Sequence, residues 1–203
     1  LGRKSGRGFY DYSDGASPPE PHEHEADGGP FIEGLDFNAA VEYEGALIRR
    51  SDGYSAHTVA QRLGKPVLVH DLIAPGVDAS RVAFSASDQV SDTAVQAFVN
   101  AAATHGLRAS KIEDGPGLPL NRTLAMLANE AFDMVLHGTA SADDIDLAMT
   151  NGVNYPRGPL AWAKGIGIPY LVDVLDAVLA ETGDPRYRAS FGLKRAAMTG
   201  ASA

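Results

Sequence analysis

The sequence predicts an α+β protein in which a small α/β unit precedes an all-α helical domain. Three observations support this prediction. Short apolar runs alternate with helix-like stretches from residue 46 to about residue 111, and helical spacing of apolar residues dominates after residue 114. A tract with almost no bulky apolar side chains occupies residues 13–30. The whole sequence is 44% hydrophobic and 21% charged. These values are ordinary for a soluble globular protein, so we expect the chain outside this tract to fold.

The tract at 13–30 reads SDGASPPEPHEHEADGGP and predicts a flexible linker. Its proline, glycine, serine and acidic residues bury too little apolar surface to offset the entropy lost on ordering. The tract also holds His22 and His24 among glutamates, a pattern that can suggest a metal site. Two histidines in such a flexible segment are more often simply solvated, so we predict no metal site here.

The predicted α/β unit contains two successive β-α-β patterns. Its strands and helices are predicted, in chain order, at 46–50, 55–64, 66–73, 81–87, 91–106 and 107–114. In the second helix Ser91 is a plausible N-cap, the apolar residues from Val95 to Ala102 share one face, and Gly106 stands where a C-cap glycine belongs. These alternations predict a right-handed α/β layer.

The helical domain is predicted to open with a helix over residues 120–138, where Leu120, Leu124, Leu127 and Ala131 recur at helical spacing. The segment ends on a glycine, which favours a helix end there.

A second helix is predicted to begin after Ser141, because Asp144 follows three residues later in the manner of a capping box. Glycine, asparagine and two prolines interrupt the pattern at 151–159. Apolar helical spacing then resumes from Leu160 to Glu181, so the region from 115 onward is predicted to be a helical bundle.

Composition excludes several classes of function. The net charge of −9 predicts an acidic surface that repels nucleic-acid phosphates, so nucleic acid is a poor candidate partner. The sequence holds no cysteine, which excludes disulfides, thiolate nucleophiles and cysteine-based metal sites. No apolar run of about 18 residues predicts a membrane span. With no recognisable signal peptide, these features predict a cytoplasmic protein.

Two phrases of the helical part carry a family resemblance. Residues 114–122 read DGPGLPLNR, and residues 141–159 read SADDIDLAMTNGVNYPRGP. The first resembles the D-x-P-G-F-x-x-N-R pattern that opens the helical domain of the 3-hydroxyacyl-CoA dehydrogenase family. The second is similar to that family's S-x-x-D-I-D-x-A-M…G-x-x-Y-P-x-G-P run. Finding both at the right separation makes the resemblance specific.

The opening residues, LGRKSGRGFYDY, look like the phrase that closes a preceding copy of the same helical domain. The resemblance therefore implies the carboxy-terminal part of a longer bacterial enzyme with tandem helical domains, of the type associated with phenylacetate degradation. The predicted regions are the end of a preceding helical domain at 1–12, the linker at 13–30, a degenerate Rossmann-like α/β unit at 31–113, a helical domain of the family's carboxy-terminal type at 114–196, and a tail at 197–203.

The α/β unit resembles an incomplete copy of the family's nucleotide-binding half. Dinucleotide binding needs a glycine-rich turn between the first strand and the first helix, so that the backbone approaches the pyrophosphate. No G-x-G-x-x-G occurs in this sequence, and the first strand leads into Tyr54, Ser55 and Ala56, whose side chains obstruct that approach. We expect no cofactor in this chain, whereas the resemblance implies NAD in the complete enzyme.

Asn121 is the best functional candidate, because the resemblance places the matching asparagine near the bound acyl group and the catalytic histidine. A structural interpretation is open beside it, in which the amide satisfies backbone donors at the helix start. No histidine of this sequence lies in the family's histidine motif. His70 beside Asp71 could mimic an acid–base pair, although such a dipeptide is more often local packing.

The phrase around Tyr155 and Pro156 resembles the family turn that shapes the acyl groove, so both are weak candidates for substrate binding. Ala161 and Lys164 replace acids that are common in first-copy sequences of the family, which favours a scaffold role. Three basic residues are weak candidates for binding CoA phosphates, although scattered basic side chains usually form surface ion pairs. They are Arg122, Arg157 and Lys164.

Taken together, the resemblance implies a portion of an NAD-dependent 3-hydroxyacyl-CoA dehydrogenase that serves dimerisation and acyl-groove scaffolding and is inactive alone. The alternative is a non-catalytic dimerisation or binding module. The expected partners are a second copy or the missing upstream domains, with acyl-CoA bound in the complete enzyme. We expect that the short helices cannot fully bury all of their apolar residues within the domain. The residues expected to need a partner surface are Trp162, Ile166, Ile168, Tyr170 and Leu171.

Overall fold

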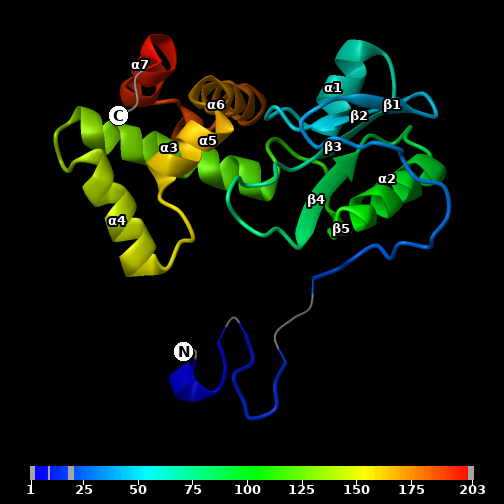
Figure 1. The fold of residues 1–203 in the computed structure, drawn as a ribbon, viewed down its shortest axis with the longest axis horizontal. Helices are drawn as coiled ribbons and strands as arrows, with labels where there is room; N and C mark the ends of the chain where they lie inside the picture. The colour runs from blue at the N-terminus through cyan, green and yellow to red at the C-terminus, as the bar shows by residue number, and fades with distance from the viewer. Residues whose placement is uncertain (1–2, 9, 18–20, 201–203) are drawn as a thin grey trace.

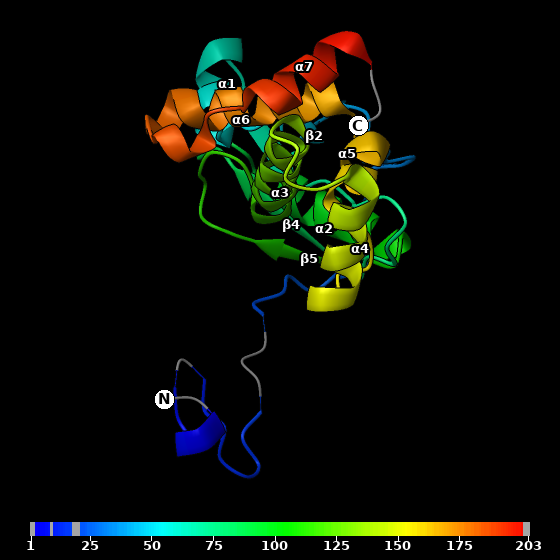
Figure 2. The same ribbon diagram turned by 90° about the vertical axis from the view of Figure 1, so that its left-hand side faces the viewer.

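The computed structural model describes residues 3–8, 10–17 and 21–200. It contains a five-stranded sheet with two helices, followed by five further helices (Figure 1). Before the sheet, residues 3–8 and 10–17 include a short 3₁₀ turn at Arg3–Ser5. Both views show this amino-terminal segment apart from the sheet and the helices (Figures 1 and 2). The predictions for residues 1–2, 9, 18–20 and 201–203 lie outside the described residues.

The sheet has the strand order β1-β2-β3-β4-β5. Its strands are β1 (Val41–Tyr43), β2 (Ala46–Arg50), β3 (Val67–His70), β4 (Arg81–Ala86) and β5 (Arg108–Lys111). Helix α1 (Ala56–Leu63) connects β2 to β3, and α2 (Asp92–Thr104) connects β4 to β5. Because β2 pairs with β3 and β4 pairs with β5 in parallel, the two predicted β-α-β units are confirmed.

Two features of the sheet were not predicted. Strand β1 forms a hairpin with β2 through Glu44 and Gly45, which both have positive φ. Strands β3 and β4 run antiparallel, so the sheet joins two β-α-β units rather than continuing one parallel layer. Pairing direction is set by contacts between distant segments, which local periodicity does not report.

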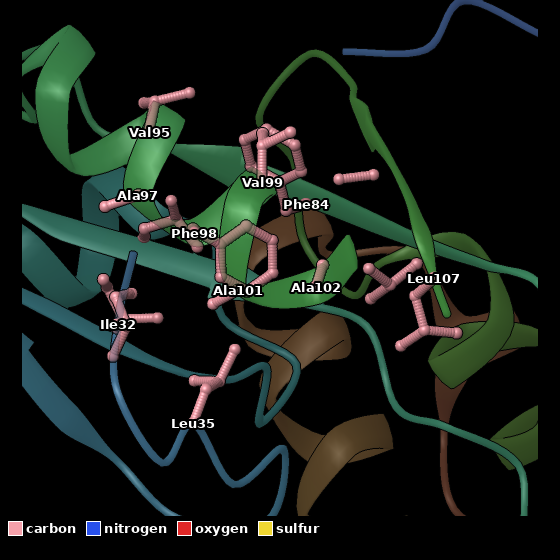
Figure 3. Packing of buried hydrophobic residues seen from close by; sticks show 14 residues of the cluster. Ile32, Leu35, Phe84, Val95, Ala97, Phe98, Val99, Ala101, Ala102 and Leu107 are labelled. Atoms are coloured by element: carbon pink, nitrogen blue, oxygen red, sulfur yellow. The ribbon is translucent and has the colours of Figure 1, made fainter. Parts of the chain in front are cut away.

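The two helices cover opposite faces of the sheet. On one face α2 packs with Phe98 against Leu68 and Phe84, and the segment before β1 adds Ile32 and Leu35 (Figure 3). On the other face, α1 packs against Val67 and Val69 of β3. Successive residues of β3 are therefore buried on alternate faces, as the period of a strand requires.

The helical domain consists of α3 (Pro119–Leu136), α4 (Ala142–Val153), α5 (Pro159–Ile166), α6 (Ile168–Thr182) and α7 (Phe191–Thr199). A 3₁₀ turn at Pro185–Tyr187 separates α6 from α7. Helix α3 contacts each of the other four (Figure 2). Helix α4 continues through the predicted break at Asn151, and α7 continues past the predicted domain end at 196. No described helix is both long enough and apolar enough to cross a membrane.

The capping signals behave as predicted. The Ser91 side chain accepts from Ala94 N–H at the start of α2, and Gly106 after its end has positive φ. Ser141 accepts from Asp144 N–H as the predicted N-cap, and its hydroxyl donates to the Asp144 carboxylate, which thus bonds the cap hydroxyl and not the cap N–H as in a full capping box.

Residues 23–30 contact the α/β unit directly. His24 N–H donates to Ala109 O at the edge of β5, and Glu23 pairs with Arg81 and Arg108. Asn100 on α2 donates to Asp27 and to Pro30 O. The flexibility of the linker stays a prediction, whereas its carboxy-terminal part already lies along the α/β unit.

Two apolar residues that were expected to need a partner surface are buried by the chain itself. Leu171 is 0% exposed and Trp162 is 7% exposed. Trp162 packs with Leu72 and Ala74, which follow β3, and with Leu124 of α3. The prediction of an exposed apolar face at Trp162 and Leu171 is therefore wrong, because the α/β unit helps to bury Trp162 and the core of the helical domain itself buries Leu171.

Candidate functional site

The start of α3 lies where the α/β unit meets the helical domain. Pro119 has no N–H, and the N-cap residue Leu118 provides no side-chain cap. The Asp71 carboxylate, just after β3, accepts instead from Leu120 N–H and Asn121 N–H, both at 2.8 Å. Burial raises the pKa of Asp71, and hydrogen bonds from these backbone groups oppose the rise. This carboxylate caps α3 from the other unit of the chain.

Asn121 is completely buried, and its side chain is already hydrogen-bonded. The amide Nδ2 donates to Ser51 O at 3.1 Å. The Tyr170 hydroxyl of α6 lies 2.5 Å from the same carbonyl and 3.1 Å from Asn121 Oδ1. Burial raises the pKa of Tyr170 to about 12, so the phenol is a donor at neutral pH. The amide joins β2, α3 and α6, while Asp71 satisfies the backbone donors that the structural interpretation had assigned to Asn121.

His70 does not form an acid–base pair with the Asp71 carboxylate. The imidazole is 0% exposed and stacks on Phe98, and its Nδ1 lies 2.9 Å from Asp71 O. Its Nε2 has no hydrogen-bond partner in the described part of the chain. Burial lowers the pKa of His70 to about 4, so the ring is neutral near pH 7. The adjacent carboxylate points to α3 instead, which makes His70 a packing residue.

The start of α1 is where a dinucleotide pyrophosphate would bind in a complete nucleotide-binding unit. Here two carboxylates of the chain occupy its backbone donors. Asp114 accepts from Ala56 N–H and His57 N–H at 2.9 Å each, and Glu181 of α6 accepts from Ser55 N–H at 3.1 Å. The residues present therefore do not fit the pyrophosphate of NAD.

The turn before α1 also packs closely against the helical domain. Gly53 has φ +103°, and a Cβ there would lie 2.6 Å from Val174 O on α6. Gly117 N–H donates to Gly53 O, which brings the motif at 114–122 against this turn. Gly53 thus permits close contact between this turn and the helical domain.

His57 was not among the predicted site residues. Its Nδ1 lies 2.7 Å from Asp114 Oδ2, and its Nε2 lies 3.2 Å from Asp88 Oδ1. Hydrogen bonds to Asp114 and then to Asp88 raise the pKa of the imidazole. Asp114 was a recognisable sequence signal because it opens the first motif, but its pairing with His57 depends on the fold.

The turn after α4 contains the predicted substrate-binding residues. Tyr155 packs against Trp162, with ring centroids 5.8 Å apart, whereas Pro156 is exposed. Asp146 of the second motif accepts from Leu160 N–H at 2.8 Å and from Ala161 N–H at 2.9 Å. It thereby caps α5, which Pro159 opens without a side-chain cap of its own.

The three basic candidates differ in their surroundings. Arg157 Nη1 donates to Pro75 O at 3.2 Å and so ties the turn to the α/β unit. Arg122 is half-buried, and Lys164 is exposed on α5. A role for these side chains in holding CoA phosphates stays a prediction.

The predicted linker histidines lie close together, with ring centroids of His22 and His24 5.6 Å apart. Within the described residues, no group of three His, Asp or Glu side chains is placed to hold a metal ion.

Two family models match the chain. One, described as "3-hydroxyacyl-CoA dehydrogenase, C-terminal domain", matches residues 117–202. The other, described as "3-hydroxybutyryl-CoA dehydrogenase reduced Rossmann-fold domain", matches residues 48–116.

Curated and solved relatives agree with these matches. The chain is 34% identical to a 3-hydroxyadipyl-CoA dehydrogenase of Escherichia coli K12, across 98% of this chain and 41% of that protein. A crystal structure of 3-hydroxybutyryl-CoA dehydrogenase from E. coli K12 is 33% identical with a TM-score of 0.86, with the same two coverages. A Ralstonia eutropha (S)-3-hydroxybutyryl-CoA dehydrogenase structure is 27% identical, with a TM-score of 0.58 over 75% of this chain and 55% of that one. The chain thus spans less than half the length of the E. coli proteins.

Proposed function

The chain belongs to the 3-hydroxyacyl-CoA dehydrogenase family, and from this premise we propose that it is the carboxy-terminal portion of an NAD-dependent enzyme. That enzyme oxidises a 3-hydroxyacyl-CoA to the 3-ketoacyl-CoA by transferring hydride to NAD. This portion contributes scaffolding of the acyl groove and assembly, and it is inactive alone. A cytoplasmic location is part of the same proposal.

The occupied start of α1 is the observation that carries this proposal. With Asp114 and Glu181 already accepting from its backbone donors, the first β-α-β unit has no free anion site for a pyrophosphate. A bound phosphate would also meet the negative charge of both carboxylates. NAD in the complete enzyme is therefore assigned to a segment outside these residues.

The role of Asn121 follows from its burial. Its amide is engaged by Ser51 and Tyr170, so it supports the junction between the two units rather than a bound acyl group. The same holds for Tyr155, whose ring packs on Trp162. We assign Asn121 to this junction, and Tyr155 with its neighbour Pro156 to the scaffold of the groove.

The direct test is an absorbance assay with acetoacetyl-CoA and NADH. We expect no turnover by the isolated chain, and turnover by a polypeptide extended upstream through a G-x-G-x-x-G strand-turn-helix. Calorimetry at millimolar NAD should show no saturable heat with the isolated chain. NADH oxidation by the isolated chain, or micromolar NAD affinity, would refute the assignment.

A second candidate function is a dimerisation or binding module, and the exposed apolar side chains of the helical domain favour it. The most exposed are Leu147 and Val153 on α4, and Phe191 and Met198 on α7. Contiguous exposed apolar patches mark interaction sites, and these four side chains are the candidates for such a surface. Sedimentation across a concentration series should show association, which Leu147→Glu or Phe191→Glu weakens. A strict monomer at high micromolar concentration would exclude this role.

A further inference from the structure

His57 lies between two carboxylates that come from different parts of the α/β unit. Asp114 follows β5 and is 10% exposed, whereas Asp88 follows β4 and is 85% exposed. The imidazole itself is 47% exposed. The ring thus bridges the start of α1 and the turn at 88–89 that leads from β4 to α2.

The geometry of the bridge indicates the protonation state of the His57 ring. A neutral imidazole has one N–H donor and one acceptor nitrogen, while an ionised carboxylate only accepts. Both ring nitrogens of His57 face carboxylate oxygens, at 2.7 Å and 3.2 Å. Only the imidazolium can donate to Asp114 and Asp88 at once, so the bridge requires a protonated ring.

The two carboxylates are held differently. Asp114 also accepts from Ala56 N–H, His57 N–H and Ser85 Oγ, so it keeps its position without the imidazolium. Asp88 is held by the ring alone among the side-chain contacts found in the described residues. Loss of the ring proton should therefore release Asp88 and leave Asp114 in place.

A hollow of about 560 Å³ opens beside this bridge. His57, Thr58 and Gln61 of α1 line it together with Lys65 and with Gln89 of the turn. Two other charged groups near the hollow or the start of α1 have partners of their own, because Lys65, which follows the end of α1, pairs with Glu42, and Glu181 accepts from Ser55 at the helix start. The charges that face the ring are thus those of Asp114 and Asp88.

We propose that His57 is a pH-operated latch, whose imidazolium ties the 88–89 turn, and with it Gln89 in the lining of the hollow, to α1. Hydrogen bonds to Asp114 and then to Asp88 raise the pKa of His57 above its ordinary 6.5. Because the folded-state pKa is raised, the latch is fully closed below pH 6.5 and is lost as the pH rises through the raised value. Opening releases the 88–89 turn, which includes Gln89 in the lining of the hollow.

The test follows the imidazole signals of the full chain by long-range ¹H–¹⁵N spectra across a pH titration. The His57 midpoint should lie above about 6.5 and should fall in Asp88→Asn. Amide protection of residues 88–91, corrected for intrinsic exchange, should step down through the wild-type midpoint. The size of that step should be about tenfold for each pKa unit that Asp88 contributes.

Asp133→Asn is the matched control. It removes the same charge next to another histidine, since Asp133 lies 3.6 Å from His137 on the helical domain. The control should leave both the His57 midpoint and the step at 88–91 unchanged. A wild-type midpoint at or below about 6.5, or a step that persists in Asp88→Asn, would overturn the latch.

Discussion

The starts of α3 and α5 are built in the same way in two different regions of the molecule. Each helix opens with a proline, and each has a distant carboxylate that accepts from the next two N–H groups. For α3 the carboxylate is Asp71, which precedes its first donor by 49 residues and is 3% exposed. For α5 it is Asp146, which precedes its first donor by 14 residues and is only half-buried.

The difference shows how one capping device serves two purposes. At α5 the carboxylate and the capped helix both belong to the helical domain, so the cap shapes a local turn. At α3 the carboxylate belongs to the α/β unit, so the cap determines how the two units are attached. The first motif extends this attachment, because Asp114 caps α1 and Asn121 binds the end of β2.

The largest expected effect comes from removing the buried cap. Asp71→Ala leaves the N–H groups of Leu72, Leu120 and Asn121 without their acceptor, and should lower the free energy of unfolding by about 3 kcal/mol. Asp146→Ala removes a more exposed cap and should cost about 1 kcal/mol. Urea unfolding of both variants measures this comparison. Equal costs would mean that burial does not distinguish the two caps.

A second test changes Gly158, which lies next to the Asp146 carboxylate that caps α5. A Cβ at Gly158 would lie 2.1 Å from Asp146 Cγ, so Gly158→Ala should displace the carboxylate and cost about 2 kcal/mol. Gly152→Ala is the matched control, because no atom lies within 4 Å of its added Cβ. Within α4 that change should stabilise by about 0.5–1 kcal/mol. A neutral Gly158→Ala would contradict the close contact.

A smaller effect is expected at the hydroxyl that joins α6 to the junction. Tyr170→Phe removes the donor to Ser51 O and should cost about 1 kcal/mol. In a double-mutant cycle with Asn121→Ala the two changes should couple by about 0.5 kcal/mol or more, because both side chains reach the same carbonyl. Strict additivity in thermal and urea unfolding would show that they act independently.

The smallest expected effect is a difference in pH dependence between two capping carboxylates. Burial raises the pKa of Asp71 above 3.8, so the part of its contribution that is linked to protonation is fully present below that pH and is lost as the pH rises through the raised value. Burial also acts on Asp114, but hydrogen bonds from His57, Ala56 and Ser85 lower its pKa below 3.8. Its contribution is therefore present above pH 3.8 and is lost as the pH falls through the lowered value.

Urea unfolding of Asp71→Asn and Asp114→Asn from about pH 3 to pH 6 measures this difference. The cost of Asp71→Asn should decrease as the pH rises, and the cost of Asp114→Asn should increase. Slopes of the same sign for both variants would be inconsistent with opposite pKa shifts.

Local patterns predicted the elements of the fold well, because they depend on nearby residues. Both β-α-β units and the caps at Ser91 and Ser141 lie where periodicity and capping chemistry indicated. The β1 hairpin was missed although Glu44-Gly45 is a short turn signal between two apolar segments. The antiparallel β3–β4 pair had no comparable local signal.

The candidate site was harder to predict, because its geometry depends on contacts between distant segments. The motifs identified Asp114 and Asn121 as important positions, but not that one caps α1 and the other binds Ser51 O. Burial of Trp162 against Leu72 and Ala74 likewise requires the α/β unit to pack on α5. Sequence spacing specifies one face of a helix, whereas the partner of that face comes from the tertiary fold.

Native-state hydrogen exchange tests most directly whether Asp71 joins the two units. We predict that amides in β3 and β4 and amides in α3 and α6 open with the same free energy in the wild-type chain. In Asp71→Ala the two sets should separate, with the sheet and the helical domain opening independently, whereas in Asp146→Ala they should stay together. Independent opening of the two regions in the wild-type chain would contradict the claim that this carboxylate couples them.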